Sequence, residues 1–421
     1  MIKDTTVQTY SSFVLSTGLR IIYLPSVSPV SYCGFAINAG TRDETPGQFG
    51  LAHFVEHVLF KGTKKRKAWH ILNRMENVGG ELNAYTTKEE TFLYSICLAE
   101  DTERAMELLS DLVFHSQFPE PEIEKEREVV LDEIQSYEDN PSELIFDEFE
   151  NLLFKGNEIG HSILGEEASL KTFTSASCHA FTQNFYYPEN MIFFFSGKTP
   201  FAKIQRLANK YFTEPGRGGV CLPSGVCPPK CRKSPGVVLP VQEKINKELH
   251  QSHVMIGSRG YSLHDKKRIG LYLLNNLLGG PGMNSRLNVS LREKQGLVYT
   301  VESGLTSYSD TGVFNIYFGC DHESVDKCLR LTYKELKKLR DCELSSSQLS
   351  AAVKQLKGQL GVSSDHKENV ALGMGKSFLH YNQYDRLPEL YAKIEAVTNR
   401  QLLEIANEVF DEKNLFRLIY E

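Results

Sequence analysis

The sequence contains no apolar run long enough to cross a membrane and no excess of basic residues. A membrane-spanning helix needs roughly 18 or more apolar residues, whereas the longest candidate, MIFFFSG at 191–197, has the length of a buried strand. The first residues, MIKDTTVQTYSSFVL, lack the basic flank and apolar stretch of a secretory signal, and they do not form an Arg-rich transit peptide. These absences predict a cytoplasmic protein without a membrane partner.

Charge balance and cysteine content exclude two further classes of protein. The chain has 47 lysines and arginines against 53 aspartates and glutamates, a net charge of −6, whereas a nucleic-acid protein needs a basic surface to neutralise phosphates. Nine scattered cysteines, an odd number, argue against a full disulfide framework and favour a reducing compartment. Cys221, Cys227 and Cys231 lie close together, and a metal site there is an alternative, although their spacing matches no standard zinc pattern.

Length and local composition divide the chain into two halves. A chain of 421 residues is too long for one ordinary hydrophobic core, so two or more domains are expected. The segment 213–235 is rich in Gly, Pro and Cys and lacks periodicity, which is typical of a linker. We therefore expect one domain at 1–212 and a second domain at 236–421.

The two halves repeat one plan. An apolar strand leads through a Gly-containing loop into a helix at 31–51 and again at 252–271. Near the end of each half, a predicted helix, turn and hydrophobic strand follow Thr174 and Thr398, at a constant offset of 224 residues. Two matches in the same order indicate a duplicated domain. The predicted fold class is α+β, with two homologous α/β-sandwich domains, each a mostly antiparallel sheet with helices packed on one face.

The segment GQFGLAHFVEHVLF at 47–60 carries the strongest chemical signal. From Phe49 to Phe60 it predicts a buried helix, because this stretch is apolar nearly all round except for His53, Glu56 and His57. Buried imidazoles need partners, and two histidines four residues apart share a helical face on which both can bind one ion. The order H-x-x-E-H is a recognised metallopeptidase motif. The alternative is a pair of core histidines bonded to backbone carbonyls, with Glu56 paired to a cation.

A hydrolytic zinc site also needs a third protein ligand and one open position for water. The predicted helix at 122–138 offers that ligand, because Glu126 and Glu133 interrupt its apolar inward stripe. The apolar members of the stripe are Val129, Val130, Ile134 and Tyr137. A merely acidic, solvated helix is the alternative, and it accounts for Glu124 and Glu128 better than for Glu133.

Four blocks of the chain together resemble the insulinase, pitrilysin and mitochondrial processing peptidase family of inverted zinc peptidases, in its short two-domain form. The blocks are HFVEHVLFKGT from residue 53, ENVGGELNAYTTKEETFLY from 76, EKEREVVLDEI from 124 and GGPGMNSRLNVSLREKQGLVYTV from 279. The resemblance implies that His53, His57 and Glu133 bind one zinc ion per chain. It also implies that Glu56 is the catalytic base and that Glu126 is an accessory glutamate that supports the site.

The block at 79–86 resembles the substrate-binding edge strand of the same family. The resemblance implies that Gly80, Asn83, Ala84 and Tyr85 contact the substrate, since an exposed strand edge can add an extended peptide as a further strand. The alternative is an ordinary sheet strand after a glycine turn.

The second half retains the scaffold without metal ligands. The helix positions equivalent to His53, Glu56 and His57 are Leu273, Asn276 and Leu277, which together cannot hold zinc. By the resemblance, Arg292 and Tyr299 match the family's substrate-contacting pair and stabilise a peptide carbonyl or an oxyanion. Ordinary surface roles are the alternative for these two residues.

The resemblance implies a zinc-dependent endopeptidase that hydrolyses short or unfolded peptides. It further implies a homodimer, or a heterodimer with a homologue, that closes around a chamber, with Arg292 and Tyr299 serving the partner's zinc. We therefore assign the catalytic zinc-binding role to the domain at 1–212 and substrate contacts to the non-catalytic domain at 236–421. The alternatives are a non-catalytic or peptide-binding subunit of the same fold that supports an active peptidase.

Overall fold

The computed structural model describes residues 9–212 and 232–421, which form two compact units. The first unit comprises the described residues up to 134, residues 162–232 and residues 364–384, and the second comprises the remainder. Most of the expected linker therefore lies outside the described residues, as do Cys221, Cys227 and Cys231. Within the described residues, none of the helices has the length and apolar character needed to cross a membrane.

The first unit is built on a mixed, mostly antiparallel sheet. Its strand order is β1 (Ser11–Val14), β2 (Arg20–Pro25), β6 (Met191–Gly197), β3 (Val30–Ile37), β5 (Thr91–Leu98) and β4 (Glu81–Thr86). Only the β2–β6 pair is parallel among these neighbours. The MIFFFSG segment is β6, which is buried along its whole length, as predicted.

The second unit repeats this topology from β2 onward, without a counterpart of β1 among its described residues. Its order is β7 (Gln242–Ile245), β11 (Phe416–Tyr420), β8 (Ser252–Gly260), β10 (Gly312–Cys320) and β9 (Val298–Ser307). The β7–β11 pair is parallel like β2–β6, and every later pair is antiparallel, as in the first sheet. Thr174 and Thr398 cap equivalent helices, each accepting a bond from the backbone N–H three residues on. The duplicated α+β plan is confirmed.

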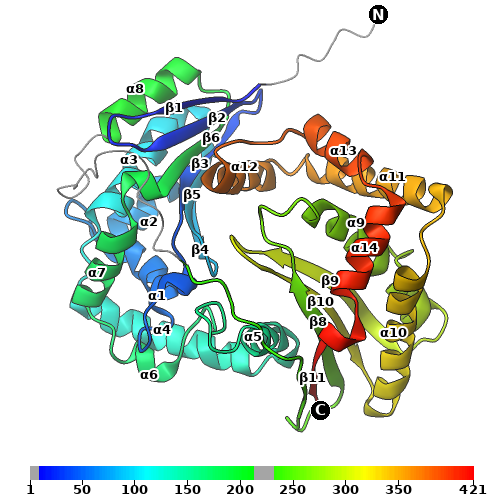
Figure 1. Cartoon of the computed structure of the whole chain (residues 1–421). Coiled ribbons are helices and arrows are strands. Elements are labelled where there is room, and N and C mark those ends of the chain that lie inside the picture. The colour runs from blue at the N-terminus through cyan, green and yellow to red at the C-terminus, as the bar shows by residue number, and fades with distance from the viewer. Residues whose placement is uncertain (1–8, 213–231) are drawn as a thin grey trace, which may run out of the picture. The chain divides into compact units, whose positions relative to one another are not determined.

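Helices from the same half of the chain cover one face of each sheet. In the first unit these are α1 (Leu51–Val58), α2 (Ala68–Glu76), α3 (Thr102–His115), α4 (Glu120–Glu138), α6 (Glu167–Leu170), α7 (Ser175–Phe185) and α8 (Phe201–Tyr211). In the second they are α9 (Arg268–Gly279), α10 (Val325–Asp341), α11 (Ser346–Ser363), α13 (Leu387–Glu395) and α14 (Asn399–Val409). Figure 1 shows this grouping within each unit.

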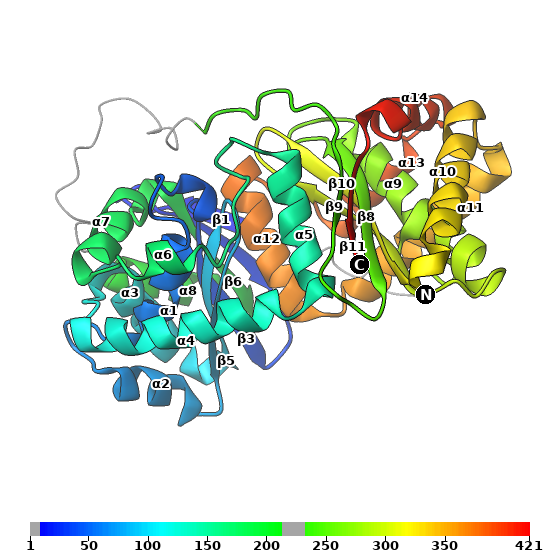
Figure 2. The same cartoon turned by 90° about the horizontal axis from the view of Figure 1, so that it is seen from below.

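A single helix from the opposite half of the sequence covers the other face of each sheet. Helix α12 (Lys367–Tyr381) packs on the first sheet around Phe92 and Phe194 (Figure 1). Helix α5 (Pro141–Leu153) packs on the second sheet against β8 and β11 (Figure 2). The strands are apolar on both faces, so each sheet needs helices on both of its faces to keep these side chains from water.

The exchange of α5 and α12 corrects the expected contiguous division at 1–212 and 236–421. Residues 135–161 belong to the second unit and residues 364–384 to the first. The expectation of helices on one face of each sheet was likewise incomplete. The physical reason lies in strands such as β5, TFLYSICL, whose residues on both faces are buried or partly buried up to Cys97.

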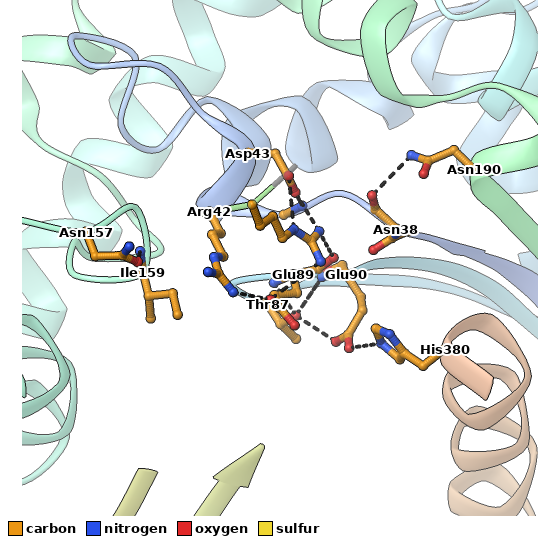
Figure 3. Close-up of polar contacts among 12 residues, drawn as sticks. Asn38, Arg42, Asp43, Thr87, Glu89, Glu90, Asn157, Ile159, Asn190 and His380 are labelled. Carbon is orange, nitrogen blue, oxygen red and sulfur yellow. Dashed lines mark hydrogen bonds and ion pairs between the residues drawn. The ribbon is translucent and has the colours of Figure 1, made fainter. Parts of the chain in front are cut away.

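A buried ion pair fixes α12 to the first sheet. His380 Nε2 lies 2.5 Å from Glu90 Oε1, and both side chains are almost inaccessible to solvent (Figure 3). Lys376, one turn earlier on α12, lies 3.1 Å from the same carboxylate. Burial alone would raise the pKa of Glu90, but the hydrogen bond from His380 and the charge of Lys376 lower it to about 2.

Glu90→Gln should therefore destabilise the protein in a pH-dependent way. A carboxylate whose pKa is lower in the folded state stabilises that state above its unfolded pKa, and this contribution is lost as the pH falls through the folded value. We expect a loss on the order of 2 to 3 kcal/mol at pH 7, shrinking between about pH 5 and pH 2. Urea unfolding across this range measures it. The exposed Glu76→Gln is the control, and an equal loss at pH 7 and pH 3 would contradict the prediction.

Candidate functional site

Helix α1 carries the three polar side chains that the H-x-x-E-H spacing singles out. It is surrounded by the core of the first unit, and its apolar residues Phe54, Val55 and Val58 are fully buried. His53 is buried, and His57 is partly accessible on the same helical face. The predicted buried helix is confirmed, although it is shorter than expected and ends in a 3-10 turn at Leu59–Lys61.

The N-terminus of α1 is held by a carboxylate from outside the helix. Its first residue follows Gly50, which has a φ of 94° and no side chain with which to cap the helix. Glu44 fills that role, because its two carboxylate oxygens accept the N–H groups of Gly50 at 2.8 Å and Ala52 at 2.7 Å. A buried negative charge at a helix N-terminus also complements the helix dipole. Glu44 thereby fixes where α1 begins and where its side chains point.

Helix α4 supplies the carboxylates. Glu126 is buried and Glu133 half-buried, while Glu124 and Glu128 are exposed, as the acidic-helix alternative expected for those two. Val129, which the periodicity placed in the inward stripe, is instead 51% exposed. Val129 therefore lies outside the buried face of α4, whereas its neighbour Val130 belongs to that face.

The side chains of His53, His57 and Glu133 converge. Their donor atoms all lie within 4.8 Å of one another, and they form the one cluster of this kind that the described residues contain. The two Nε2 atoms are 3.2 Å apart, and Glu133 Oε2 lies 3.7 Å from His53 Nε2 and 3.5 Å from His57 Nε2. The predicted third-ligand residue is thus beside the two histidines.

These distances fit a zinc ion. Ligands about 2.0 to 2.2 Å from a tetrahedral ion lie roughly 3.3 to 3.6 Å from one another. The carboxylate–imidazole separations of 3.5 and 3.7 Å are too long for direct hydrogen bonds. Two nitrogens and one oxygen also match the donor set of catalytic zinc sites, which leave a fourth position for water. A direct His53–His57 hydrogen bond explains the contact between the rings but not the placement of Glu133.

Glu126 orients His57. Its Oε1 lies 3.0 Å from His57 Nδ1, and its Oε2 lies 2.5 Å from Lys61 Nζ. When the neutral imidazole donates its Nδ1 proton to this carboxylate, Nε2, which faces His53 and Glu133, can bind a metal ion. Burial tends to raise the pKa of Glu126, but the bonds to His57 and Lys61 lower it overall, so Glu126 is ionised. An accessory position for Glu126 agrees with this geometry.

The two histidines differ electrostatically. Burial, together with the neighbouring His57, lowers the pKa of His53 to about 3, so its imidazole is neutral and suited to bind a metal. Burial also lowers the pKa of His57, but the hydrogen bond that it donates to Glu126 and the nearby charges of Glu133 and Glu56 raise it overall. A proton therefore competes with a metal ion at His57 rather than at His53.

Glu56 projects from α1 beside the cluster and accepts a hydrogen bond from Thr86. Thr86 Oγ1 lies 2.6 Å from Glu56 Oε2. Burial raises the pKa of Glu56, against the opposing effects of this hydrogen bond and of His57. A carboxylate with a raised pKa close to a metal site has the properties of a general base.

Strand β4 forms an edge of the first sheet, because among the described residues it pairs only with β5. Tyr85 stacks on Phe92 with ring centroids 4.8 Å apart. Gly80 packs within the sheet, where a Cβ would lie only 3.0 Å from Ile96 O and Met75 Cε. The edge placement agrees with the sequence expectation, whereas Gly80 has a packing role of its own. Substrate contacts of Gly80, Asn83, Ala84 and Tyr85 remain a prediction.

The second unit has a cavity where the first has its metal ligands. Helix α9 presents Leu273 and Asn276 at the positions equivalent to His53 and Glu56, and both are buried. A cavity of about 410 Å³ lies between α9 and β9. Arg292 and Tyr299 both line it, with the guanidinium carbon 5.6 Å from the centre of the Tyr299 ring. Tyr299 is 85% exposed.

Sequence reasoning missed three residues of the first unit that support the site, namely Glu44, Lys61 and Thr86. Each supports a helix or a side chain that the sequence did identify. Glu44 caps α1, Lys61 pairs with Glu126, and Thr86 donates a hydrogen bond to Glu56. Lys61 and Thr86 lie inside the quoted motif blocks. A buried carboxylate such as Glu44, seven residues before the first residue of the helix, gives no periodic signal.

The sequence matches two family profiles and resembles proteins named as zinc proteases along most of its length. The sequence profile described as "Insulinase (Peptidase family M16)" matches residues 20–167, and that described as "Peptidase M16 inactive domain" matches residues 172–356. An uncharacterized zinc protease of Streptomyces coelicolor is 31% identical over 401 residues, covering 95% of this chain and 87% of the relative. The uncharacterized zinc protease YmxG of Bacillus subtilis is 30% identical over 413 residues, covering 97% of each chain.

Two solved structures share the fold. A protease from Helicobacter pylori aligns with a TM-score of 0.89 at 22% identity, over 99% of this chain and 100% of the other. A Pseudomonas fluorescens structure described as a peptidase M16 inactive domain also aligns with a TM-score of 0.89, at 19% identity and over 98% and 97% of the two chains.

Glu126→Gln should weaken zinc binding without unfolding the protein. The amide cannot hold His57 as a charged acceptor, and loss of such an outer partner typically costs about 10- to 100-fold in metal affinity. Competition titration with a chromogenic chelator measures the affinity. Glu128→Gln, on the exposed face of the same helix, should bind zinc like the wild type. Equal affinities for all three proteins would show that Glu126 has no part in the site.

Proposed function

Because this chain belongs to the insulinase family of peptidases, family M16, we propose that it is a zinc-dependent endopeptidase that cleaves short or unfolded peptides. The observation that carries the proposal is the convergence of His53, His57 and Glu133, with a partly buried carboxylate, Glu56, on the same helix turn as the two histidines. The names of the zinc protease relatives in Streptomyces and Bacillus support the same class of reaction.

Each side chain of the site has its own role in the proposed hydrolysis. His53, His57 and Glu133 would hold the zinc ion, which when bound acts as a Lewis acid toward the scissile carbonyl and acidifies water. Glu56 accepts a proton from the attacking water and returns it to the departing amine. Glu126 keeps the His57 imidazole in the orientation and tautomer that metal binding needs, and Lys61 keeps Glu126 in place.

The free edge of β4 is the proposed site for the peptide backbone. An extended peptide paired with β4 would contact the strand at Asn83, Ala84 and Tyr85, after the turn that ends at Gly80. Recognition through backbone hydrogen bonds predicts weak selectivity for sequence and exclusion of folded proteins, which cannot present an extended strand.

Arg292 and Tyr299 are the proposed substrate contacts of the second unit. The exposed Tyr299 and the neighbouring guanidinium offer donors for a peptide carbonyl or for the oxyanion of the tetrahedral intermediate. We further propose that two chains, identical or homologous, assemble around a chamber. Sedimentation velocity, combined with activity measured on mixtures of Arg292→Ala and His57→Ala proteins, tests whether the pair serves the partner chain.

Glu56→Gln should retain zinc and lose turnover by at least about 100-fold, because the amide cannot accept the proton of the water. His53→Ala should lose the metal itself. The measurements are zinc content by atomic absorption and cleavage of a mixed library of quenched fluorescent peptides, with and without chelator.

The outcomes separate the possible functions. Zinc-dependent cleavage by the wild type, lost in Glu56→Gln with the metal retained, supports the endopeptidase. A zinc-loaded wild type that binds peptides without cleaving them favours a peptide-binding subunit. Full activity of zinc-loaded Glu56→Gln would refute the role of Glu56 as the base.

A further inference from the structure

A single hydroxyl group connects the edge strand to the side chain that acts on water. Thr86 is the last residue of β4, and Thr86 Oγ1 donates to Glu56 Oε2 at 2.6 Å. Side chains alternate along a strand, so Thr86 points to the same face as Leu82 and Ala84, which pack into the core around α1. The hydroxyl is therefore the polar end of an otherwise apolar stripe.

The hydrogen bond restrains one carboxylate oxygen and leaves the other available. A carboxylate at the end of the three-bond glutamate side chain has several rotamers, and a short bond to an ionised acceptor selects among them. Among the described residues, Thr86 is the hydrogen-bond donor to Glu56, and it uses Oε2. Glu56 Oε1 has no hydrogen-bond partner within that part of the chain, so it is free to accept a proton from water.

Thr86 is itself held in place by the turn that follows it. Its backbone pairs with Thr91 across the β4–β5 hairpin. The segment Gly40–Asp43 docks on the turn: Thr41 N–H donates to Thr87 O, and Arg42 N–H donates to Lys88 O. A Cβ on Gly40 would lie 2.3 Å from Thr87 O, so only glycine permits this approach.

Buried charges lock the same turn. Arg42 Nη1 lies 2.6 Å from Glu89 Oε1, with both side chains inaccessible (Figure 3). Asp43 binds Arg232 through both carboxylate oxygens, at 3.1 and 2.8 Å, and Arg232 also donates to Glu89 O at 3.0 Å. The next residue, Glu44, caps α1. One segment, residues 40–44, thus fixes both the turn beside Thr86 and the helix that carries Glu56.

We infer that Thr86 is a positioning residue that holds the carboxylate of Glu56 in the orientation needed to accept a proton from water. The inference rests on the proposed peptidase function and extends it to a residue that contacts no metal ligand. It also implies that β4, the proposed peptide-binding edge, ends in the group that orients the base.

Three variants test the role. Thr86→Val keeps the shape of the side chain and removes the hydroxyl, Thr86→Ser keeps the hydroxyl, and Thr172→Val is the matched control. Thr172 is exposed, and its hydroxyl donates to Ser169 O at 2.7 Å, outside the turn and the site.

Steady-state cleavage of a quenched fluorescent peptide should show a change in kcat alone. We expect kcat of Thr86→Val to fall roughly tenfold or more, since small misplacements of catalytic groups have effects of this size. KM should stay within about twofold, and zinc affinity should be unchanged. Thr86→Ser should recover most of kcat, and the control Thr172→Val should keep the kcat of the wild type. In crystals of Thr86→Val, Glu56 should occupy more than one rotamer.

The results that overturn the inference differ from those that overturn the proposed function. Wild-type cleavage with an equal kcat in Thr86→Val overturns the role of Thr86 alone. Loss of zinc or of folding in Thr86→Val, without rescue by serine, also overturns it, because Thr86 is then a structural support. A zinc-loaded wild type that cleaves no peptide overturns the proposed function itself.

Discussion

Two imidazoles and a carboxylate on a buried helix set the constraint on which the first unit depends. Such groups cannot stay in an apolar core without polar partners, because each unpaired group costs several kcal/mol. His53, Glu56 and His57 find their partners in two other elements: Glu133 and Glu126 on α4, and Thr86 on β4. The fold therefore has to bring α4 and the end of β4 to the same side of α1.

The rigidity of this arrangement comes from residues that take no part in the chemistry. The segment 40–44 connects the N-terminus of α1 to the turn after β4 through Glu44 and Arg42. Glu90, in that turn, is paired with His380 of α12. A helix from late in the chain thus stabilises the turn that positions Thr86. Stability and the geometry of the site are linked through shared residues in this unit.

The sequence allowed the elements with clear periodicity and the motif residues to be predicted. The strand expected at 191–197 appears as β6, and the helix expected at 122–138 appears as α4. The duplication was visible because a cap such as Thr398 recurs at a fixed offset.

The exchange of α5 and α12 could not be predicted, because a local pattern shows that a helix has an apolar face but not which sheet covers that face. The same holds for Glu44 and Thr86, whose roles depend on contacts made only in the folded chain. Val129 was wrongly placed on the buried face of α4, because the period of a helix locates the edge of its apolar face only to within about one residue.

The second unit shows what remains when the chemical constraint is removed. Apart from a counterpart of β1, which the described part of this unit lacks, its strand order and pairing are those of the first unit, while Leu273 and Asn276 take the places of His53 and Glu56. A helix without metal ligands needs no carboxylate opposite it, and a cavity lined by Arg292 and Tyr299 lies beside it.

Anomalous diffraction recorded on both sides of the zinc absorption edge, from crystals grown with the metal, tests the central claim most directly. We expect one strong peak per chain, about 2.0 to 2.2 Å from Nε2 of His53, Nε2 of His57 and a carboxylate oxygen of Glu133. A peak held by other residues, or no peak at these three side chains in a folded and zinc-saturated protein, would contradict it.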